Sequence, residues 1–229
     1  MLFWGIPYFG PSMILLLPAL ALAIYAQYRV SSTYSRYSTV RASSGLTAQQ
    51  AARRIMDSEG VSGVSIERIE GKLRDHYDPR AKVLRLSDPD SQSVAAVGVA
   101  AHEAGHAIQH ARHYQPLVLR TAVVPVANLG STLAIPLILL GFVLAFTPLI
   151  TVGIVAFAAA VLFTLITLPV EFNASHRAVV ALRASGSMNE EEIGEVREVL
   201  SAAALTYVAA AAIAALQLVM FVMAANRRR

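Results

Sequence analysis

Two histidines and a glutamate stand within a five-residue segment near the middle of the chain, as His102, Glu103 and His106. Histidines four residues apart lie on one face of an α-helix, so both imidazoles can reach a single zinc ion. Glu103 points about 100° away from His102, which places its carboxylate beside the metal rather than among the ligands. The pentapeptide is the H-E-x-x-H signature, in which zinc lowers the pKa of a bound water and the glutamate accepts its proton.

The surroundings of this motif favour a buried metal site. From Gln92 to His110 the sequence predicts a helix of about 20 residues made mainly of Ala, Val and Gly, which suits a buried core helix. Burying imidazole and carboxylate groups there costs several kcal/mol unless a metal or another partner satisfies them. The alternative is that the motif forms the exposed polar end of a core helix.

A catalytic zinc needs a third protein ligand, and Glu171 is the best candidate for it. It is the first charged residue after an uncharged run of 50 residues, and a carboxylate at a membrane boundary is usually functional or paired. The alternative is that Glu171 is an acidic residue at the start of an interfacial helix. His110 lies two turns beyond His102, so we expect it to support the site or lie on the surface rather than bind the metal.

The elements that must position these residues are strongly apolar. Hydrophobic residues make up 55% of the 229 residues and charged residues 15%, against about 25% charged residues in soluble domains. Three stretches carry no charge, and the middle one is long enough for two membrane-spanning helices joined by a turn at Thr147-Pro148. The predicted spans lie near residues 8–27, 127–146, 149–169 and 203–224.

The segment between the first two spans has the pattern of a small folded domain. Thr47 and Gln50 form a capping-box pattern that starts a helix. Alternating apolar residues predict a strand within residues 61–69 and another within residues 82–87, and residues 75–80 predict a turn. The second strand is either an edge strand onto which a peptide adds or an ordinary core strand.

The distribution of basic residues favours placing this segment in the cytosol. Residues 29–120 carry thirteen of the nineteen Lys and Arg residues, and residues 171–200 carry three more. Arg227–Arg229 conflict with that orientation, so either the last helix lies along the interface or a weak C-terminal signal is outvoted. The basic residues follow the N-terminal apolar stretch, which indicates a retained anchor; the alternative is a cleaved signal ending near Ala19-Leu20-Ala21.

Composition also limits the partners of the chain. It has no cysteine, which excludes structural disulfides and cysteine-based metal sites or nucleophiles. The net charge of +4 is explained by membrane topology, and there is no nucleic-acid motif, so we expect no nucleic-acid partner. The expected surroundings are a lipid bilayer, and exposed apolar helices are compatible with a membrane oligomer or a partner protein.

Three segments together resemble one protein family: Asp75–Arg80, Val94–Gln109 and Leu168–Ser175. On these segments the chain resembles the YugP-like neutral zinc metallopeptidases of bacterial membranes over nearly its whole length. The last segment is also similar to the Glu-Phe-x-Ala element of HtpX-type and CAAX prenyl membrane proteases, and the resemblance implies that Glu171 is the third zinc ligand. Those proteases have an aspartate shortly afterwards, whereas Asn173 and Ser175 occupy the nearby positions here.

The resemblance implies a gluzincin-like core flanked by transmembrane helices. The expected fold is mainly α, with about four transmembrane helices and a small α+β zincin-like catalytic domain that contains a short β element. The predicted segments are an N-terminal transmembrane anchor at 1–28, a cytosolic-side catalytic domain at 29–120, a transmembrane hairpin at 121–170, a helix with the third ligand and a connector at 171–200, and a C-terminal transmembrane helix at 201–229.

These features predict a membrane-embedded endopeptidase of the bacterial plasma membrane that uses Zn²⁺ at the cytosolic side to cleave peptides or membrane-protein substrates. The expected metal ligands are His102, His106 and Glu171, and the expected catalytic base is Glu103. The candidates for stabilising the oxyanion of the transition state are His76, Tyr77, His176 and Arg177. The alternative is a catalytically inactive membrane scaffold that binds zinc. A transporter is disfavoured, because the predicted spans hold almost no polar residues.

Overall fold

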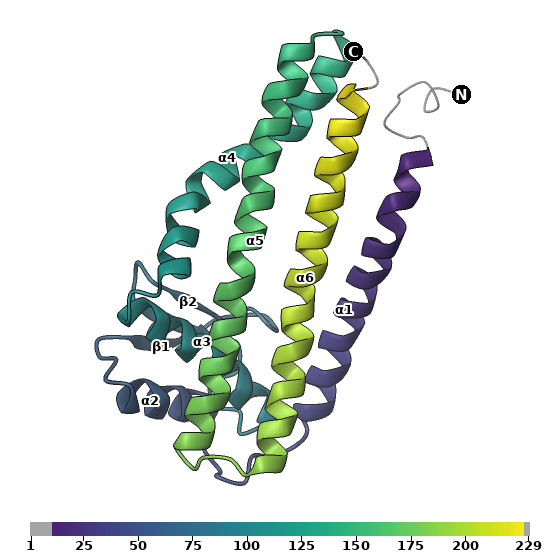
Figure 1. Cartoon of the computed structure of the whole chain (residues 1–229). Helices are drawn as coiled ribbons and strands as arrows, with labels where there is room; N and C mark the ends of the chain where they lie inside the picture. Colours follow the sequence, from purple (N-terminus) through teal and green to yellow (C-terminus); the bar gives the residue numbers. More distant parts are fainter. Residues whose placement is uncertain (1–10, 227–229) are drawn as a thin grey trace. The chain divides into compact units, whose positions relative to one another are not determined.

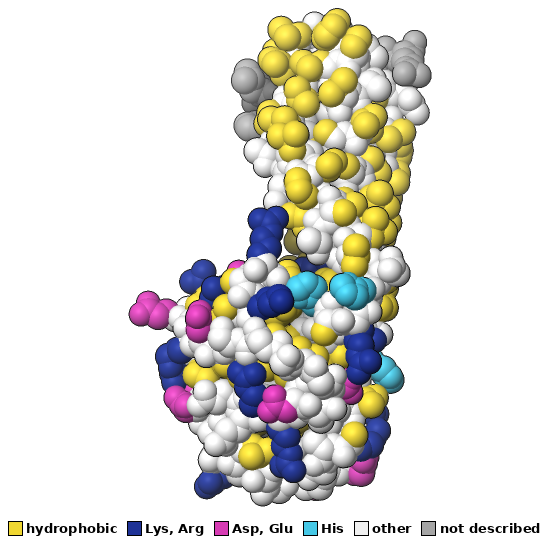
Figure 2. Space-filling view, turned by 90° about the vertical axis from the view of Figure 1, so that its left-hand side faces the viewer, with side chains coloured by type: hydrophobic (Ala, Val, Ile, Leu, Met, Phe, Trp, Pro, Cys, Tyr) yellow, Lys and Arg dark blue, Asp and Glu magenta, His cyan; other side chains and the backbone are white. Residues whose placement is uncertain are grey.

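The computed structural model describes residues 11–226 and divides into two compact units. The first unit comprises residues 1–26, 119–168 and 206–229, and the second comprises residues 27–118 and 169–205. Arg120 is the one charged residue among the described residues of the first unit. Accordingly, Figure 2 shows hydrophobic side chains over the visible face of the first unit, whereas charged and histidine side chains gather on the second.

Four helices of the described chain are long and apolar enough to cross a membrane, which confirms the predicted number of spans. They are α1 (Leu17–Tyr37, preceded by the 3-10 helix η2 at Pro11–Leu16), α4 (Gln115–Val143), α5 (Thr147–Ala184) and α6 (Glu190–Asn226), labelled in Figure 1. Helix α5 has 38 residues and α6 has 37, whereas the hydrocarbon core requires about 20. The third and fourth predicted spans therefore lie inside much longer helices. Their bounds were set by the ends of the uncharged stretches, and a helix can continue past the first charged residue.

The other predicted ends also differ from the structure. The turn of the hairpin lies at residues 144–146, and Thr147 already begins α5, so the turn precedes its predicted place. Pro148 fits there, because the first turn of a helix does not need its missing backbone N–H. The start of the first predicted span, at residue 8, lies outside the described residues, as do Arg227–Arg229.

Within the first unit, glycines allow α4 and α5 to approach closely. A Cβ atom on Gly130 would lie 2.5 Å from the carbonyl oxygen of Ala156, and one on Gly153 would lie 3.0 Å from that of Ala134. Phe157 of α5 also packs edge-to-face against Phe221 of α6, with 5.1 Å between ring centroids. Small residues that bring helix backbones together are the usual basis of packing in lipid, where the hydrophobic effect adds little.

The second unit contains two short helices, α2 (Ala48–Ser58) and α3 (Val94–Ala111), in addition to parts of α1, α5 and α6. The predicted capping box is confirmed, because Thr47 accepts from the Gln50 backbone N–H and the Gln50 side chain accepts from the Thr47 backbone N–H. The Ser93 side chain caps α3 by accepting from the backbone N–H of Ala96 at 3.2 Å. Both N-termini thus have local partners for their unsatisfied donors.

A three-stranded sheet completes this unit, with strands β1 (Ser65–Arg68), β2 (His76–Asp78) and β3 (Val83–Leu86) in the order β1-β3-β2. Strand β3 pairs in parallel with β1 and antiparallel with β2. Of the two alternatives for the strand at residues 82–87, the edge strand is therefore wrong and the core strand is confirmed, because both edges of β3 are already paired. The turn expected at residues 75–80 is only partly correct, because residues 76–78 form strand β2 and the turn lies at residues 79–82. The Asp78 side chain closes this turn by accepting from the backbone N–H groups of Arg80 and Ala81.

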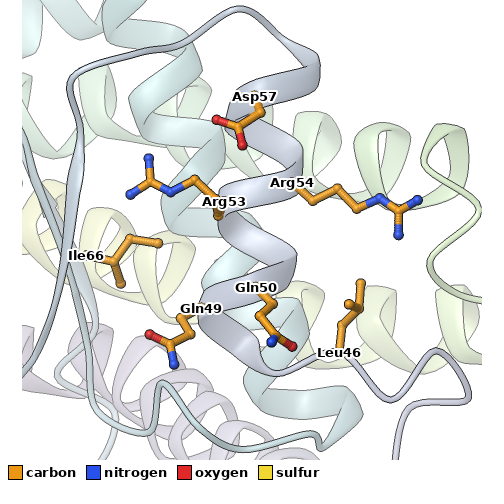
Figure 3. A pocket seen from close by; sticks show the side chains of 7 residues that line it. All are labelled: Leu46, Gln49, Gln50, Arg53, Arg54, Asp57 and Ile66. Carbon is orange, nitrogen blue, oxygen red and sulfur yellow. The ribbon is translucent and has the colours of Figure 1, made fainter.

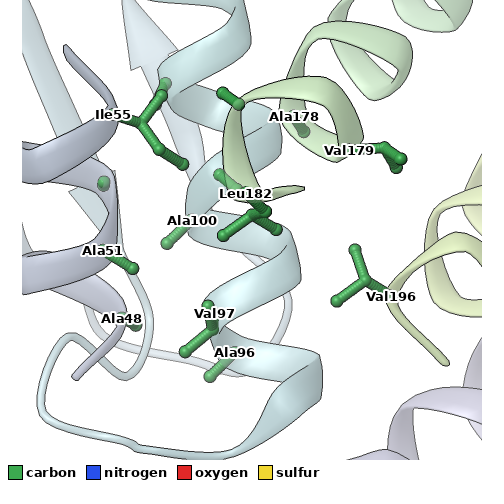
Figure 4. Packing of buried hydrophobic residues seen from close by; sticks show 14 of the residues in the cluster. Ala48, Ala51, Ile55, Ala96, Val97, Ala100, Ala178, Val179, Leu182 and Val196 are labelled. Carbon is green, nitrogen blue, oxygen red and sulfur yellow. The ribbon is translucent and has the colours of Figure 1, made fainter. Parts of the chain in front are cut away.

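Helix α3 lies in the core of the second unit, as its composition predicts. It packs between α2 and the lower parts of α5 and α6, as the labelled side chains in Figure 4 show. Gly98 permits the contact with α6, since a Cβ atom there would lie 3.1 Å from the Val196 side chain. An apolar helix buried on nearly all sides is a rigid support for the few polar residues that it carries.

Candidate metal centre

The structure brings His102 and His106 of α3 together with Glu171 of α5, all within the second unit. Each residue offers a ligand atom, and the three atoms lie within 4.8 Å of one another. The Glu171 Oε2 atom is 3.3 Å from His102 Nε2 and 3.5 Å from His106 Nε2. The two imidazole rings are nearly perpendicular, with 4.8 Å between their centroids.

These distances fit a tetrahedral zinc site. Bonds of about 2.0–2.1 Å at tetrahedral angles place neighbouring ligand atoms about 3.3–3.4 Å apart. Glu171 is only 2% exposed, and a buried carboxylate is costly unless a cation or charged donors balance it. Two imidazoles and a carboxylate are also the donor set of catalytic zinc sites that keep a position for water.

Close contact between α3 and α5 is what places Glu171 beside the histidines. A Cβ atom on Gly105 would lie 2.6 Å from the backbone carbonyl oxygen of Ala174, so a glycine between the two histidines lets the helices meet. Ala174 is three residues after Glu171, on the same face of α5. The helix α5 runs unbroken through this region, so the alternative that Glu171 starts an interfacial helix is wrong.

The outer nitrogen of each histidine also has a partner. His102 Nδ1 lies 3.1 Å from Ser175 Oγ, and His106 Nδ1 lies 3.0 Å from Gln109 Oε1. Hydrogen bonds of this kind orient metal-binding imidazoles and leave Nε2 available for the metal. Ser175 thus contacts His102 here, near the position at which the proteases resembled in sequence have an aspartate. Gln109 was not among the site residues predicted from the sequence. The feature that could have indicated it is a polar side chain in an apolar helix, three residues after His106.

Glu103 lies on the same helix as the two histidines and is 8% exposed. Burial lowers the pKa of His106, but the adjacent Glu171 carboxylate and the charge of Glu103 outweigh that effect, so the pKa lies above its ordinary value. The negative potential of two carboxylates at this point favours a bound cation.

The other predicted residues occupy different places. The Tyr77 hydroxyl lies 2.9 Å from His110 Nδ1, so Tyr77 contacts the helix that carries the motif. His76 Nδ1 lies 2.9 Å from the carbonyl oxygen of Arg74, and Arg177 Nε donates to Asn173 Oδ1 at 2.8 Å. Their roles in stabilising a transition state, like that of His176, stay predictions.

A separate open pocket of about 660 Å³ lies beside α2 in the same unit. Figure 3 shows its lining, which comes from α2, Leu46 and Ile66 of β1. The pocket shares no residue with the group of His102, His106 and Glu171, so it does not belong to the candidate metal centre.

Comparison with known proteins gives matches that agree with this geometry. A family model described as "Putative neutral zinc metallopeptidase" matches residues 12–226. A curated protein of Bacillus subtilis (strain 168), named "Putative membrane protease YugP", is 49% identical over 211 residues, which cover 91% of this chain and 94% of that protein. No solved structure matches the chain.

Proposed function

Because this chain belongs to the family described as "Putative neutral zinc metallopeptidase", we propose that it is a membrane-embedded, zinc-dependent endopeptidase. The observation that carries the proposal is the position of Glu171 Oε2, 3.3 Å and 3.5 Å from the Nε2 atoms of two histidines on another helix. Glutamate and histidines far apart in sequence converge at the spacing that one zinc ion requires. The same helix carries Glu103 directly after the first histidine.

In this proposal His102, His106 and Glu171 hold the metal, and Glu103 moves the proton. Zinc, when bound, supplies a Lewis acid that polarises the scissile carbonyl and makes water a better nucleophile. The Glu103 carboxylate accepts a proton from the attacking water and returns it to the amine nitrogen of the leaving peptide. Ser175 and Gln109 keep the two imidazoles oriented while these steps occur.

Two variants test the assigned roles. Glu103→Ala removes the proton acceptor but no ligand, so we expect zinc content to stay and cleavage of casein or a membrane-protein substrate to fall by at least about 100-fold. Glu171→Ala removes a ligand, so we expect loss of both zinc and cleavage. Zinc is quantified on the same purified samples by mass spectrometry. Retained zinc-dependent cleavage in Glu103→Ala protein would refute the proposed mechanism.

An inactive zinc-binding scaffold is the alternative function. It predicts the same zinc content in the wild type and in Glu103→Ala, but no cleavage by either. The two proposals therefore differ in a single measurement, the zinc-dependent cleavage of the wild type compared with Glu103→Ala at equal zinc content.

We also propose that the second unit faces the cytosol of a bacterium and that its substrates are peptides or membrane-protein segments. The four apolar helices and the membrane-protease relative support a multi-pass membrane protein, and the excess of basic residues supports the orientation. The chain lacks cysteine, so Ser62→Cys provides a single thiol at an exposed position of this unit. In intact cells we expect that thiol to react with a membrane-permeant maleimide but not with an impermeant one; the reverse pattern would contradict the orientation.

A further inference from the structure

Gln109 is a completely buried polar side chain whose amide contacts both helices of the candidate metal centre. It is 0% exposed and lies one turn after His106 on α3. Its Oε1 atom is 3.0 Å from His106 Nδ1, and its Nε2 atom is 2.8 Å from the Val170 carbonyl oxygen and 3.0 Å from Asn173 Oδ1. Val170 and Asn173 flank Glu171 on α5, so this one amide links a histidine ligand to the segment that carries the carboxylate ligand.

The partners fix which way the Gln109 amide points. The Val170 carbonyl oxygen can only accept a hydrogen bond, so the group that faces it must be the NH₂ group of Gln109. Asn173 gives an independent check. Its Oδ1 atom also accepts from Arg177 Nε, which can only donate, so the Asn173 atom that faces Gln109 is an oxygen.

The direction of this amide determines the state of His106. Since the NH₂ group faces α5, the oxygen of Gln109 faces His106, and that oxygen can only accept. His106 must therefore carry hydrogen on Nδ1. In the neutral imidazole the lone pair is then on Nε2, the atom 3.5 Å from Glu171 Oε2.

We propose that Gln109 is a positioning residue that holds His106 in its metal-binding tautomer and fastens the Glu171 segment to α3. Arg177 and Asn173 set the direction of the amide, and Gln109 transmits it to His106. This inference rests on the proposed zinc site. It also gives a reason for Asn173: the position needs an oxygen that accepts from two donors, Gln109 and Arg177.

The first test is the zinc dissociation constant of the full-length protein in detergent, measured by competition with a chelator. Gln109→Leu removes the acceptor for His106 and both donors to α5, so we expect about 10–100-fold weaker zinc binding, the usual effect of losing such a partner. Gln49→Leu is the matched control. Gln49 belongs to α2, its side-chain amide donates to Asp90, and it lies outside the metal centre. We expect its zinc affinity to equal that of the wild type.

A pair of substitutions at Asn173 tests the direction of the amide without altering α3. Asn173→Asp keeps an oxygen that accepts from Gln109 and Arg177, so its zinc affinity should stay within about threefold of the wild type. Asn173→Leu removes that oxygen and should bind zinc more weakly than Asn173→Asp. Equal affinities for the two variants would contradict the proposal, and this comparison remains available if Gln109→Leu does not fold.

The Nδ1–H proton of zinc-loaded His106 provides a signature that a purely structural role would not change. In zinc-loaded, ¹⁵N-histidine-labelled protein, we expect a slowly exchanging, downfield Nδ1–H resonance that the control substitution Gln49→Leu leaves unchanged. In Gln109→Leu it should shift upfield and exchange faster with water. An unchanged resonance and zinc affinity in Gln109→Leu would overturn the inference about Gln109 and leave the proposed function standing. A wild type that binds no zinc would overturn the proposed function itself.

Discussion

At the scale of single residues, Ser175 shows how the chain supports His102 without the aspartate of the proteases that it resembles. Ser175 Oγ lies 3.1 Å from His102 Nδ1, four residues after Glu171 on the same face of α5. A hydroxyl accepts from the imidazole N–H less strongly than a carboxylate does. The difference can be measured directly as zinc affinity.

We predict that Ser175→Ala binds zinc about 10-fold more weakly than the wild type, because His102 loses the partner that orients it. Ser175→Asp should bind at least as tightly as the wild type, since a carboxylate is a stronger acceptor and makes the imidazole a better ligand. Chelator competition on the purified variants measures both constants. Identical affinities for Ser175→Ala and the wild type would show that the contact does not support the metal.

Sequence spacing was enough to suggest the ligands but not the residues behind them. His102 and His106 follow from helical periodicity, and Glu171 from its isolated charge and the family resemblance. The contacts of Gln109 and Ser175 depend on the register of α5 against α3, which is set by a close backbone approach at Gly105. No local pattern encodes that register, so the partners of the imidazoles emerge only from the three-dimensional structure.

At the scale of helices and strands, the distance between α3 and α5 is the quantity on which the centre depends. We predict that Gly105→Ala loses most of its zinc and unfolds at a lower temperature. Its Cβ atom would lie 2.6 Å from the Ala174 carbonyl oxygen, which belongs to backbone and cannot rotate away, and such overpacking costs about 1–3 kcal/mol. Zinc content and thermal unfolding of the purified variant provide the measurement.

The matched control for this substitution is Gly194→Ala in α6. A Cβ atom at Gly194 meets nothing within 4 Å, so the added methyl group should only favour the helix, by about 0.5–1 kcal/mol. We expect full zinc content and unchanged or higher thermal stability. If Gly105→Ala behaved like Gly194→Ala, close packing of α3 on α5 would not be what places Glu171.

Strand β2 is joined to α3 through Tyr77 and His110. Burial, together with the nearby Asp78 charge, raises the pKa of Tyr77, so its hydroxyl stays protonated and can donate to His110 Nδ1. We predict that Tyr77→Phe lowers the free energy of unfolding by about 0.5–1.5 kcal/mol, because the ring is kept and one hydrogen bond is lost. The same substitution in a His110→Ala background should have a smaller effect; equal effects in both backgrounds would rule out this link.

The strands were the part of the fold that sequence patterns described least well. Alternation located β1 and β3, but β2 has only three residues and ends at the Asp78-Pro79 step, so its pattern is too short to distinguish from a turn. Strand order cannot be inferred from alternation at all, which is why the sequence left open whether β3 is an edge strand or a core strand. Helix positions were clearer, because capping residues and long uncharged runs leave local signals.

At the scale of the whole molecule, the two units depend on different sources of stability. The first unit is built from apolar helices that carry one charged residue within the described chain, so a bilayer or detergent must surround it. The second unit has a compact core around α3 and, in our proposal, gains further stability from zinc. The division of the chain into five segments stays a prediction, since each unit combines residues from distant parts of the sequence.

Removal of the metal should therefore affect the units unequally. A ligand that binds only the folded state at about 1,000 times its dissociation constant stabilises that state by about 4 kcal/mol, and a chelator abolishes this contribution. We predict faster amide hydrogen exchange in α3 and residues 169–205 of detergent-solubilised protein after chelation, with little change in residues 119–168. Mass spectrometry of deuterated peptides resolves these segments.

Glu171→Ala protein, which should lack zinc already, is the control and should not respond to the chelator. A uniform increase across both units would show instead that the chain opens as one cooperative structure, and no increase in the wild type would show that zinc does not stabilise the centre.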